Sequence, residues 1–357
     1  MDRLTAAYAL QILAQHLAPI RALLDDPTIQ EIMINAFDDI RIERAGEIEH
    51  LADIRLDEAG LSTAITIIAN MNDKGAPRPI LDARLAGLRI AAAKKPIAMR
   101  GDMMCIRKHA MRHITLVDYL QRGAFDVVPF DERVSGAERR RMTQLLAGLK
   151  HGGQAVLDFL QWMIEAHINA ILSGSTSAGK TTLLNALTGV IPAHERLITI
   201  EDTGELQVHV PNYVSFETNP GQGITVRDLV RLALRCRPDR IVVGEVRGPE
   251  AFDLLDALNT GHSGSAVSFH ADSSALALPR LESMIRMAPE TQNWPLVDLR
   301  RQIANTFRFV IHAQRVGASR GPCEIREILG VDDQGRYLTR LLFSKIQQEA
   351  SAYEEAA

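Results

Sequence analysis

The 357-residue chain is predicted to be an α/β protein, with a mostly parallel sheet in its carboxyl-terminal half and a smaller α+β domain before it. From about residue 154 onward, short apolar runs rich in β-branched residues alternate with helical stretches, a pattern typical of parallel sheets. The first of these runs leads into Gly174-Ser-Thr-Ser-Ala-Gly-Lys-Thr181, which matches the phosphate-binding pattern G-x-x-x-x-G-K-[ST]. The sequence therefore predicts a nucleotide-binding domain over residues 154–345.

The first 115 residues are predicted to form the α+β domain. A helix is expected over residues 4–24, because apolar residues gather on one face and Asp25-Asp26-Pro27 ends the segment. Beyond it we expect strands at 32–34, 40–42, 85–92 and 103–106, a turn at 36–39, a helix at 61–71 and a loop at 73–79. Short strands mixed with two helices are typical of a small α+β domain.

Residues 116–153 are predicted to be a linker between the two domains. The stretch is polar, has a helical pattern and contains Pro129 and Gly136. Three adjacent arginines at 139–141 point in different directions on a helix, so we interpret them as part of a solvated face. At the end of the chain, residues 346–357 are predicted to be a polar tail.

Each buried strand expected in the second domain is followed by a group that can do chemistry. These strands are predicted at 169–173, 197–200, 241–243 and 266–269. The phosphate-binding loop follows the first, and Glu201, Glu245 and His270 follow the others in turn. Because the carboxyl ends of parallel strands meet at one edge of a sheet, these groups should converge there. Glu201, or Asp202 beside it, could instead cap a helix.

The loop residues are predicted to hold ATP and Mg²⁺. The predicted nucleotide contacts are Gly174, Ser175, Thr176, Ser177, Ala178, Gly179, Lys180, Thr181 and Thr182. The glycines let the backbone fold around a phosphate so that its N–H groups point inward. Lys180 then reaches the outer phosphates, and the Thr181 hydroxyl can hold the metal ion.

Phosphoryl transfer to water also needs a metal shell and an acceptor for the water proton. Glu245 is placed to hold the Mg²⁺ shell or to orient water, and Glu201 is placed to act as the general base. Both are carboxylates at strand ends, so the two roles could be exchanged. His262 and His270 flank a glycine-bearing segment and could sense the terminal phosphate, although a histidine there could also be structural.

The composition excludes several classes of protein. A net charge of −4, with two Trp and five Tyr, offers little of the basic, aromatic channel that a nucleic-acid translocase needs. Cys105, Cys236 and Cys323 are far apart, which suggests buried thiols in a reducing compartment. No apolar run reaches the roughly 18 residues that a membrane span needs, and the first residues lack the core of a signal peptide. We therefore expect a cytoplasmic protein.

Four segments of the second domain resemble the boxes of the secretion ATPase family, the motors of type IV secretion, conjugal transfer, pilus movement and type II secretion. They are a Walker A loop at 174–182, an aspartate box at 198–206, a Walker B box at 237–248 and a histidine box at 260–271. The resemblance implies a RecA-like P-loop domain that hydrolyses ATP and assembles as a homo-hexamer. It also implies peripheral association with inner-membrane components of a secretion or pilus apparatus.

The resemblance extends into the first domain. The similar segments are Glu31–Asn35, Arg41–Arg44, Arg78–Ile80 and Ile106–Lys108. It implies a nucleotide bound between the two domains, with Arg100 and Arg107 contacting its phosphates; surface salt bridges are the alternative. Two features depart from the family pattern. Ser177 replaces a frequent glycine, which is tolerable at a negative φ, and the stretch from Asp118 to Asn169 is longer than usual.

The leading hypothesis is a hexameric ATPase that powers a type IV secretion or conjugation apparatus. The chain lacks the paired C-x-x-C element of the type II and pilus-extension branches, whereas the tight-adherence pilus motors remain an alternative. A RecA-like nucleic-acid translocase is a rival from another class. A nucleotide-gated scaffold is another, although the presence of both Glu201 and Glu245 speaks against it.

Overall fold

A computed structural model of the chain describes residues 11–72, 79–85, 87–108, 115–121, 123–126 and 132–346. Contacts divide the chain into two units. The first comprises Met1–Val134, Ile200–Gly204 and Asn212–Pro238, and the second comprises Ser135–Thr199, Glu205–Pro211 and Asp239–Ala357. The beginning of the helix expected at 4–24, the loop expected at 73–79 up to Arg78, and all but the first residue of the tail at 346–357 lie outside the described residues. The domain limits drawn from the sequence stay predictions.

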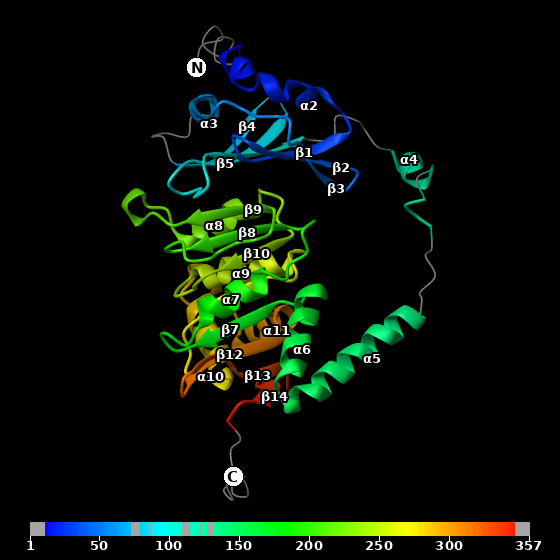
Figure 1. The fold of residues 1–357 in the computed structure, drawn as a ribbon, viewed down its shortest axis with the longest axis vertical. Coiled ribbons are helices and arrows are strands. Elements are labelled where there is room, and N and C mark those ends of the chain that lie inside the picture. The colour runs from blue at the N-terminus through cyan, green and yellow to red at the C-terminus, as the bar shows by residue number, and fades with distance from the viewer. Residues whose placement is uncertain are drawn as a thin grey trace, which may run out of the picture. The chain divides into compact units, whose positions relative to one another are not determined.

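An antiparallel sheet of six strands forms the body of the first unit (Figure 1). Its strands, in the order in which they pair, are β3 (Glu47–His50), β2 (Asp39–Arg44), β1 (Ile29–Ala36), β6 (Met103–Lys108), β5 (Leu88–Ala93) and β4 (Ile80–Leu85). The other elements of the unit are η1 (Ala18–Ile20), α2 (Arg21–Asp25), α3 (Glu58–Met71), α4 (Leu116–Gln121), β9 (Asn212–Glu217), η3 (Pro220–Gln222) and α8 (Val226–Ala233). The strands predicted at 32–34, 40–42 and 103–106 are confirmed. The strand predicted at 85–92 is confirmed only from Leu88 onward, because the chain turns at Gly87 between β4 and β5. The sequence analysis missed β3, β4 and β9.

Helix α3 shows why this part of the chain folds as predicted. The Asp57 carboxylate accepts a hydrogen bond from the Gly60 N–H at 2.6 Å, which satisfies one of the free donors at the start of the helix. Leu61, Ile65 and Ile68 recur at helical spacing and are fully or almost fully buried in one apolar cluster with the sheet. Burial of this stripe fixes the helix on the sheet.

The larger sheet has eight strands and is mixed. In pairing order they are β14 (Tyr337–Ser344), β13 (Ser319–Val331), β12 (Phe309–Val316), β7 (Ala170–Gly174), β11 (Ala266–Phe269), β10 (Arg240–Val243), β8 (Arg196–Glu201) and β9. β7 pairs in parallel with β11 and β12, and β11 pairs in parallel with β10. β12, β13 and β14 pair antiparallel, so the sheet departs from the parallel pattern toward that end.

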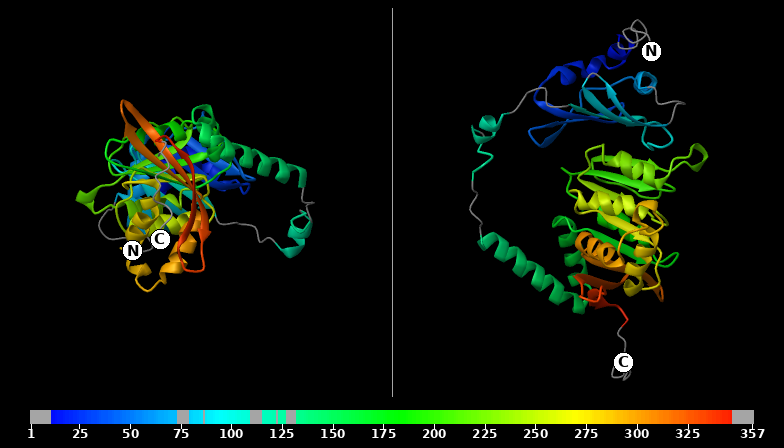
Figure 2. Two further views of the ribbon diagram at one scale, coloured as in Figure 1. Left: turned by 90° about the horizontal axis from the view of Figure 1, so that it is seen from below. Right: turned by 180° about the vertical axis from the view of Figure 1, so that it is seen from behind.

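Helices cover both faces of this sheet within the second unit. They are α6 (Gln154–Glu165), α7 (Lys180–Thr188), α9 (Glu250–Asn259), α10 (Ser274–Ile285) and α11 (Leu296–Thr306), with η2 (Leu149–His151) and η4 (Pro289–Thr291). Before them in the chain, α5 (Glu132–Gly148) extends away from the sheet (Figure 1). α6 and α7 contact each other on the face that is turned to the viewer in Figure 1. α9, α10 and α11 cover the other face, which is seen on the right of Figure 2. This is the α/β layering that the sequence predicts.

Two further predictions concern single residues and helix length. Cys105, Cys236 and Cys323 are all buried, as expected. Among the helices that the structure describes, none is both long enough and apolar enough to cross a bilayer.

A buried ion pair ties the start of β10 to its surroundings. Arg240 is fully buried, and its guanidinium pairs with the two carboxylate oxygens of Glu195. It also donates to the carbonyl oxygens of Gly264 at 3.0 Å and Ile164 at 2.8 Å. His167 lies 3.2 Å from the same carboxylate. A Cβ atom on Gly264 would collide with the guanidinium, so only glycine fits there. Arg240 is thus a structural part of the Walker B box.

Arg240→Ala should destabilise the protein strongly. The substitution removes the guanidinium partner of the buried Glu195 carboxylate, and breaking a buried pair in this way typically costs about 3 to 5 kcal/mol. Arg301→Ala is the matched control, because the Arg301 pair with Asp298 is exposed and such pairs contribute about 1 kcal/mol or less. Urea unfolding followed by circular dichroism measures both. Equal losses in the two variants would contradict this account of Arg240.

Candidate functional site

The phosphate-binding loop joins β7 to α7. All of β7 is buried between β11 and β12, and Leu183, Leu184 and Leu187 anchor α7 by their burial. A Cβ atom on Gly174 would collide with the carbonyl oxygen of Ala313 in β12, so the first loop residue must be glycine. The strand, loop and helix therefore have the arrangement that the sequence pattern requires.

Two loop residues lie in the left-handed region of backbone conformation. Gly179 has φ of 91° and is the residue before α7. Ser177 has φ of 60°, so the negative φ on which its tolerance was expected to depend is not found. A non-glycine residue pays roughly 1 to 2 kcal/mol in this conformation, because its Cβ crowds the following carbonyl. Ser177 is therefore a slightly strained member of the loop.

Lys180 is the first residue of α7 and is folded back over its own loop. Its Nζ donates to the carbonyl oxygens of Gly174 at 3.0 Å and Ser175 at 3.2 Å. It also lies 3.3 Å from His270 Nδ1. Burial lowers the pKa of Lys180, and the negative charge of Glu245 partly counteracts this. Every contact of the ammonium is to an acceptor that a phosphate oxygen could replace.

Glu245 and His270 lie together with Lys180 at the carboxyl edge of the sheet, as the sequence predicts. Glu245 follows β10 after one glycine and His270 follows β11 directly. His270 Nε2 is 3.3 Å from Glu245 Oε1, so the imidazole stands between the ammonium and the carboxylate. With Nδ1 accepting from Lys180, we assign the proton to Nε2, where it faces Glu245.

Arg247 is a member of this cluster to which the sequence analysis gave no role. Its Nε and Nη2 donate to the two oxygens of Glu245 at 2.8 and 3.0 Å, which is a bidentate pair. Hydrogen bonds from Arg247 lower the pKa of Glu245 and outweigh the opposing effect of burial. Glu245 is therefore ionised at neutral pH. The signal in the sequence was the position of Arg247 two residues after Glu245 in the Walker B box.

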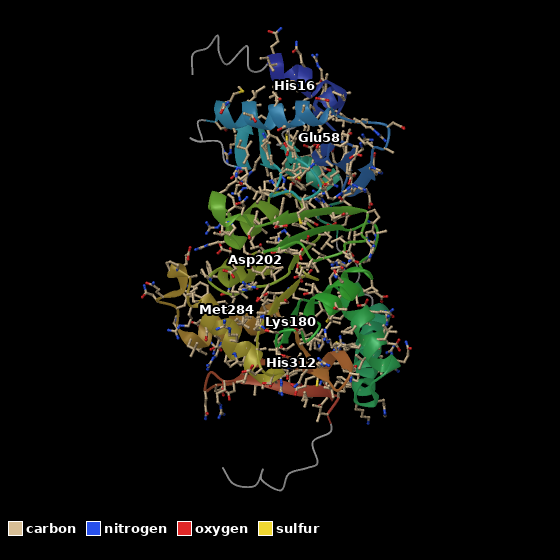
Figure 3. The ribbon with its side chains drawn as sticks, turned by 60° about the vertical axis from the view of Figure 1, so that its left-hand side comes forward. His16, Glu58, Lys180, Asp202, Met284 and His312 are labelled. Carbon is tan, nitrogen blue, oxygen red and sulfur yellow. The ribbon has the colours of Figure 1, made fainter. Side chains whose placement is uncertain are left out.

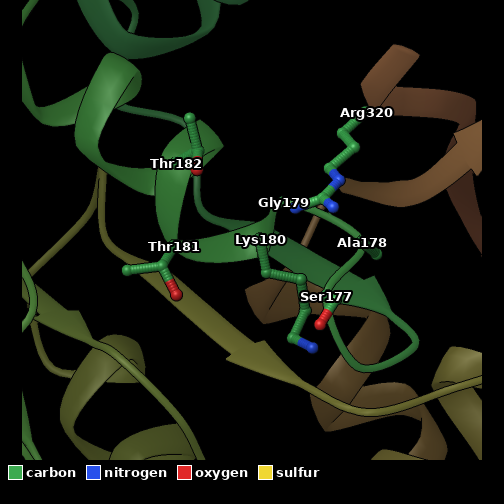
Figure 4. Close-up of a pocket in the computed structure, with 7 residues that line it drawn as sticks. All are labelled: Ser177, Ala178, Gly179, Lys180, Thr181, Thr182 and Arg320. Carbon is green, nitrogen blue, oxygen red and sulfur yellow. The ribbon is translucent and has the colours of Figure 1, made fainter. Parts of the chain in front are cut away.

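Two hollows flank the loop. One, of about 200 Å³, is lined by Arg320 and by Ser177, Ala178, Gly179, Lys180, Thr181 and Thr182 (Figure 4). The other, of about 570 Å³, lies beside Ser175, Thr176 and His270 and extends to Arg280 of α10. Of the nine predicted loop residues, six line the first hollow and two line the second. Gly174 lines neither.

Two further predicted catalytic residues are His262 and Glu201. His262 comes before β11, so it is at the amino end of the strand whose carboxyl end carries His270. Its Nδ1 lies 3.1 Å from the carbonyl oxygen of Ala257 near the end of α9, a contact that suits a structural histidine. Glu201 is the last residue of β8, is buried, and belongs with the first unit. No helix begins at Glu201 or Asp202, so neither is a helix cap.

Arg100 and Arg107 are both in the first unit and both are ion-paired. Arg100 Nη1 donates to Asp39 at 3.1 Å, and its guanidinium lies over the Tyr213 ring, 4.5 Å from the centroid. Arg107 Nε donates to the buried carboxylate of Glu31 at 3.0 Å. Burial raises the pKa of Asp39, but Arg41, Asn35 and Arg100 together hold it below its ordinary value. Both arginines thus form salt bridges, as in the alternative interpretation, and in both pairs the acid is the more buried partner.

His312 lies beneath the loop and was missed by the sequence analysis. It belongs to β12, is 3% exposed, and its Nδ1 is 3.0 Å from the hydroxyl of Ser173, the residue before Gly174 (Figure 3). Burial lowers the pKa of His312, an effect that Glu324 and Asp272 oppose and Lys180 assists. No sequence signal marked His312, because it is a single polar residue among the apolar residues at the start of β12 and belongs to no motif.

The oxygen ligands present fit a hard divalent cation. Mg²⁺ takes carboxylate and hydroxyl oxygens, and the ionised carboxylate of Glu245 and the hydroxyl of Thr181 are such donors. Glu245 is ionised because Arg247 lowers its pKa, so it is available to the metal shell as a charged group. Thr181 lines the hollow beside the loop.

Ser177→Gly should leave the loop working, whereas Ser177→Val should damage it. Glycine removes the left-handed strain of about 1 kcal/mol at the cost of a similar entropy in the unfolded chain, so we expect nearly unchanged stability. Valine is β-branched and strongly disfavoured at positive φ, at a cost of about 1 to 3 kcal/mol. Thermal unfolding and ATP turnover of both variants measure this. Valine that is tolerated as well as glycine would contradict the positive φ.

His312 should make the protein less stable as the pH falls. Its folded-state pKa is below the ordinary value, so below about pH 6.5 the unfolded state takes up the proton first and stability is lost. His312→Gln keeps a polar partner for Ser173 and cannot titrate, so it should reduce the loss of Tm between pH 7.5 and about pH 5. His151→Gln, at an exposed position, is the control. An unchanged slope in His312→Gln would refute the assignment.

Comparison with known proteins shows the family of the chain. The model of the family described as "Type II/IV secretion system protein" matches residues 134–339. The type IV secretion system protein VirB11 of Brucella suis is 35% identical over 314 residues, which cover 83% of this chain and 84% of the relative. The type IV secretion system protein PtlH homolog of Bordetella bronchiseptica is 37% identical over 246 residues, or 67% of this chain and 70% of the relative.

A solved structure is similar over almost the whole chain. It is the crystal structure of the VirB11 ATPase from the Brucella suis type IV secretion system in complex with sulphate, with a TM-score of 0.79 and 32% sequence identity. The similarity covers 91% of this chain and 96% of that one. The resemblance drawn from the four sequence boxes is thereby confirmed, and the chain belongs to the type II/IV secretion system protein family.

Proposed function

We propose that this protein is an ATPase that powers a type IV secretion or conjugation apparatus. The single observation that carries the proposal is the cluster of Lys180, His270 and Glu245 beside the phosphate-binding loop. The relatives named VirB11 and PtlH support the choice of apparatus. The tight-adherence pilus motor, the nucleic-acid translocase and the nucleotide-gated scaffold are supported by none of the relatives named above.

Nucleotide binding exchanges internal contacts of the loop for contacts with phosphate. The N–H groups of Gly174 to Thr182 bind the phosphates, and Lys180 leaves the carbonyls of Gly174 and Ser175 for a phosphate oxygen. His270, which then loses its ammonium neighbour, contacts the terminal phosphate. Because Lys180 exchanges neutral carbonyl acceptors for a charged phosphate oxygen, binding stabilises the loop around the nucleotide.

Hydrolysis uses the carboxylates and a metal ion. Thr181 and Glu245 would hold Mg²⁺, and the ion would supply positive charge at the outer phosphates. Glu201 accepts the proton of the attacking water, and Glu245 is the alternative acceptor. Arg100 and Arg107 of the first unit supply positive charge to the phosphates.

The working state in this proposal is a homo-hexamer in the cytoplasm, held against inner-membrane components of the apparatus. A head-to-tail interface whose rotation closes generates a ring. Arginines that complete a site across an interface make its activity depend on assembly. Direct binding of nucleic acid forms no part of the proposal.

Lys180→Ala should abolish ATP turnover while the protein stays folded. The change removes a charge aimed at the phosphates and no core contact, so turnover should fall to less than about a tenth. Glu245→Gln should keep nucleotide affinity and slow hydrolysis, because the amide preserves shape without the charge. Lys150→Ala, at an exposed position in η2, is the matched control. Turnover by Lys180→Ala near that of the control would exclude this site.

Mg²⁺ with ATP or an unreactive analogue should shift the protein toward a hexamer, and turnover per chain should rise with protein concentration. Mass photometry and turnover assays over a dilution series measure these two effects. Lys180→Ala should fail to shift, since its phosphate contact is lost. A protein that stays monomeric with nucleotide and keeps constant turnover per chain would rule out the motor and favour the scaffold.

A further inference from the structure

The tip of the β12–β13 hairpin brings a second basic residue to the phosphate-binding loop. Arg320 is the second residue of β13 and lines the hollow of about 200 Å³ together with residues 177–182. In Figure 4 its guanidinium lies beside Gly179, with Lys180 below it. A Cβ atom built on Gly179 would be 3.4 Å from the Cβ of Arg320, which is van der Waals contact. The hairpin and the loop thus touch.

Among the described residues, Arg320 forms no ion pair that would explain its position. In the part of the chain that the structure describes, no carboxylate pairs with it, and its side chain is exposed. Its direct cross-strand neighbour is Arg315, and like charges at opposed positions are unfavourable. Residues 315–322 contain no acid. The hairpin tip therefore places unneutralised positive charge against the loop.

The hollow beside Arg320 suits an anion. Its lining contains the cationic side chains of Lys180 and Arg320, backbone at the start of α7, and no carboxylate. A guanidinium is planar and presents paired N–H donors that match phosphate oxygens. His270, by contrast, lines the hollow on the other side of the loop, where Lys180 Nζ meets it. The side with His270 and Glu245 suits the reacting terminal phosphate, and the side with Arg320 suits the phosphates that do not react.

We propose that Arg320 binds the inner phosphates, α and β, of the nucleotide held by the loop; this rests on the function proposed above. Arg320 is then a binding residue and takes no part in the chemical step. Because ADP keeps both inner phosphates, loss of Arg320 weakens ATP and ADP alike. KM for ATP rises while kcat at saturating ATP is largely kept, unlike the loss expected of Lys180→Ala.

The test compares the full-length protein with Arg320→Ala, Arg320→Lys and Arg315→Ala. Arg315→Ala removes the same charge from the opposed position of the same hairpin, relieves the same repulsion, and does not line the hollow. Calorimetric titration with ADP and Mg²⁺, and with pyrophosphate and Mg²⁺, measures Kd for each protein. Arg320→Ala should raise Kd for both ligands about tenfold, as loss of one charge-assisted hydrogen bond does, and Arg320→Lys should raise it less.

Three outcomes separate the proposals. Equal Kd values for Arg320→Ala and Arg315→Ala, with normal binding by the unaltered protein, overturn the role of Arg320 and leave the proposed function intact. A weaker affinity for ADP with unchanged affinity for pyrophosphate also overturns it, because the contact would then be to the base or ribose. An unaltered protein that binds neither ligand refutes the proposed function itself. Thermal unfolding of each variant verifies that it is folded.

Discussion

The parallel pairing of β7 with β11 and β12 is the constraint on which the candidate site depends. Phe269 of β11 is opposite Ser173, so His270 lies level with Gly174 at the beginning of the loop. Ala313 of β12 is opposite Gly174, which places its carbonyl where any Cβ on that residue would collide. A register shift by one residue would turn each of these side chains to the other face. The site is therefore a property of the sheet and not of the loop alone.

The same pairing determines the electrostatics of the loop. Lys180, His270, Glu245 and Arg247 form one chain of contacts in which positive and negative groups alternate around a single imidazole. In this state the ammonium and the carboxylate are both satisfied by protein atoms. A ligand must supply at least as many charge-assisted bonds as it displaces, which a polyphosphate with its metal ion can do and a neutral molecule cannot. The site is therefore selective for a polyanion, because Lys180 and Glu245 already have protein partners that a ligand must replace.

Sequence predicted the elements whose local pattern is strong. The strands before the loop and before His270 were placed to within a residue, because they are short apolar runs between polar ends. Strands β12 and β13 were missed, and with them Arg320 and His312. β12 and β13 form an antiparallel hairpin that follows the helices α10 and α11. The spacing of residues in the sequence does not show that this hairpin lies against the phosphate-binding loop. The positive φ of Ser177 was missed for a related reason, since β12 and α7 impose the loop conformation.

One short segment, β10 with its flanking residues, shows how structural and functional charge are separated. At its amino end, Arg240 is fully buried, and its guanidinium binds Glu195 and the carbonyl oxygens of Gly264 and Ile164. At its carboxyl end, Glu245 is partly exposed and its partner Arg247 is mostly exposed. Breaking a buried ion pair strongly destabilises a protein, because one charge is left buried without its partner. The pair of Arg240 with Glu195 therefore holds the start of β10 in place. An exposed pair is held weakly by comparison and can exchange partners at little cost. The buried end of β10 thus positions Glu245, while the contacts of the Glu245 carboxylate can still be replaced. A residue that must bind a metal ion and water needs both properties.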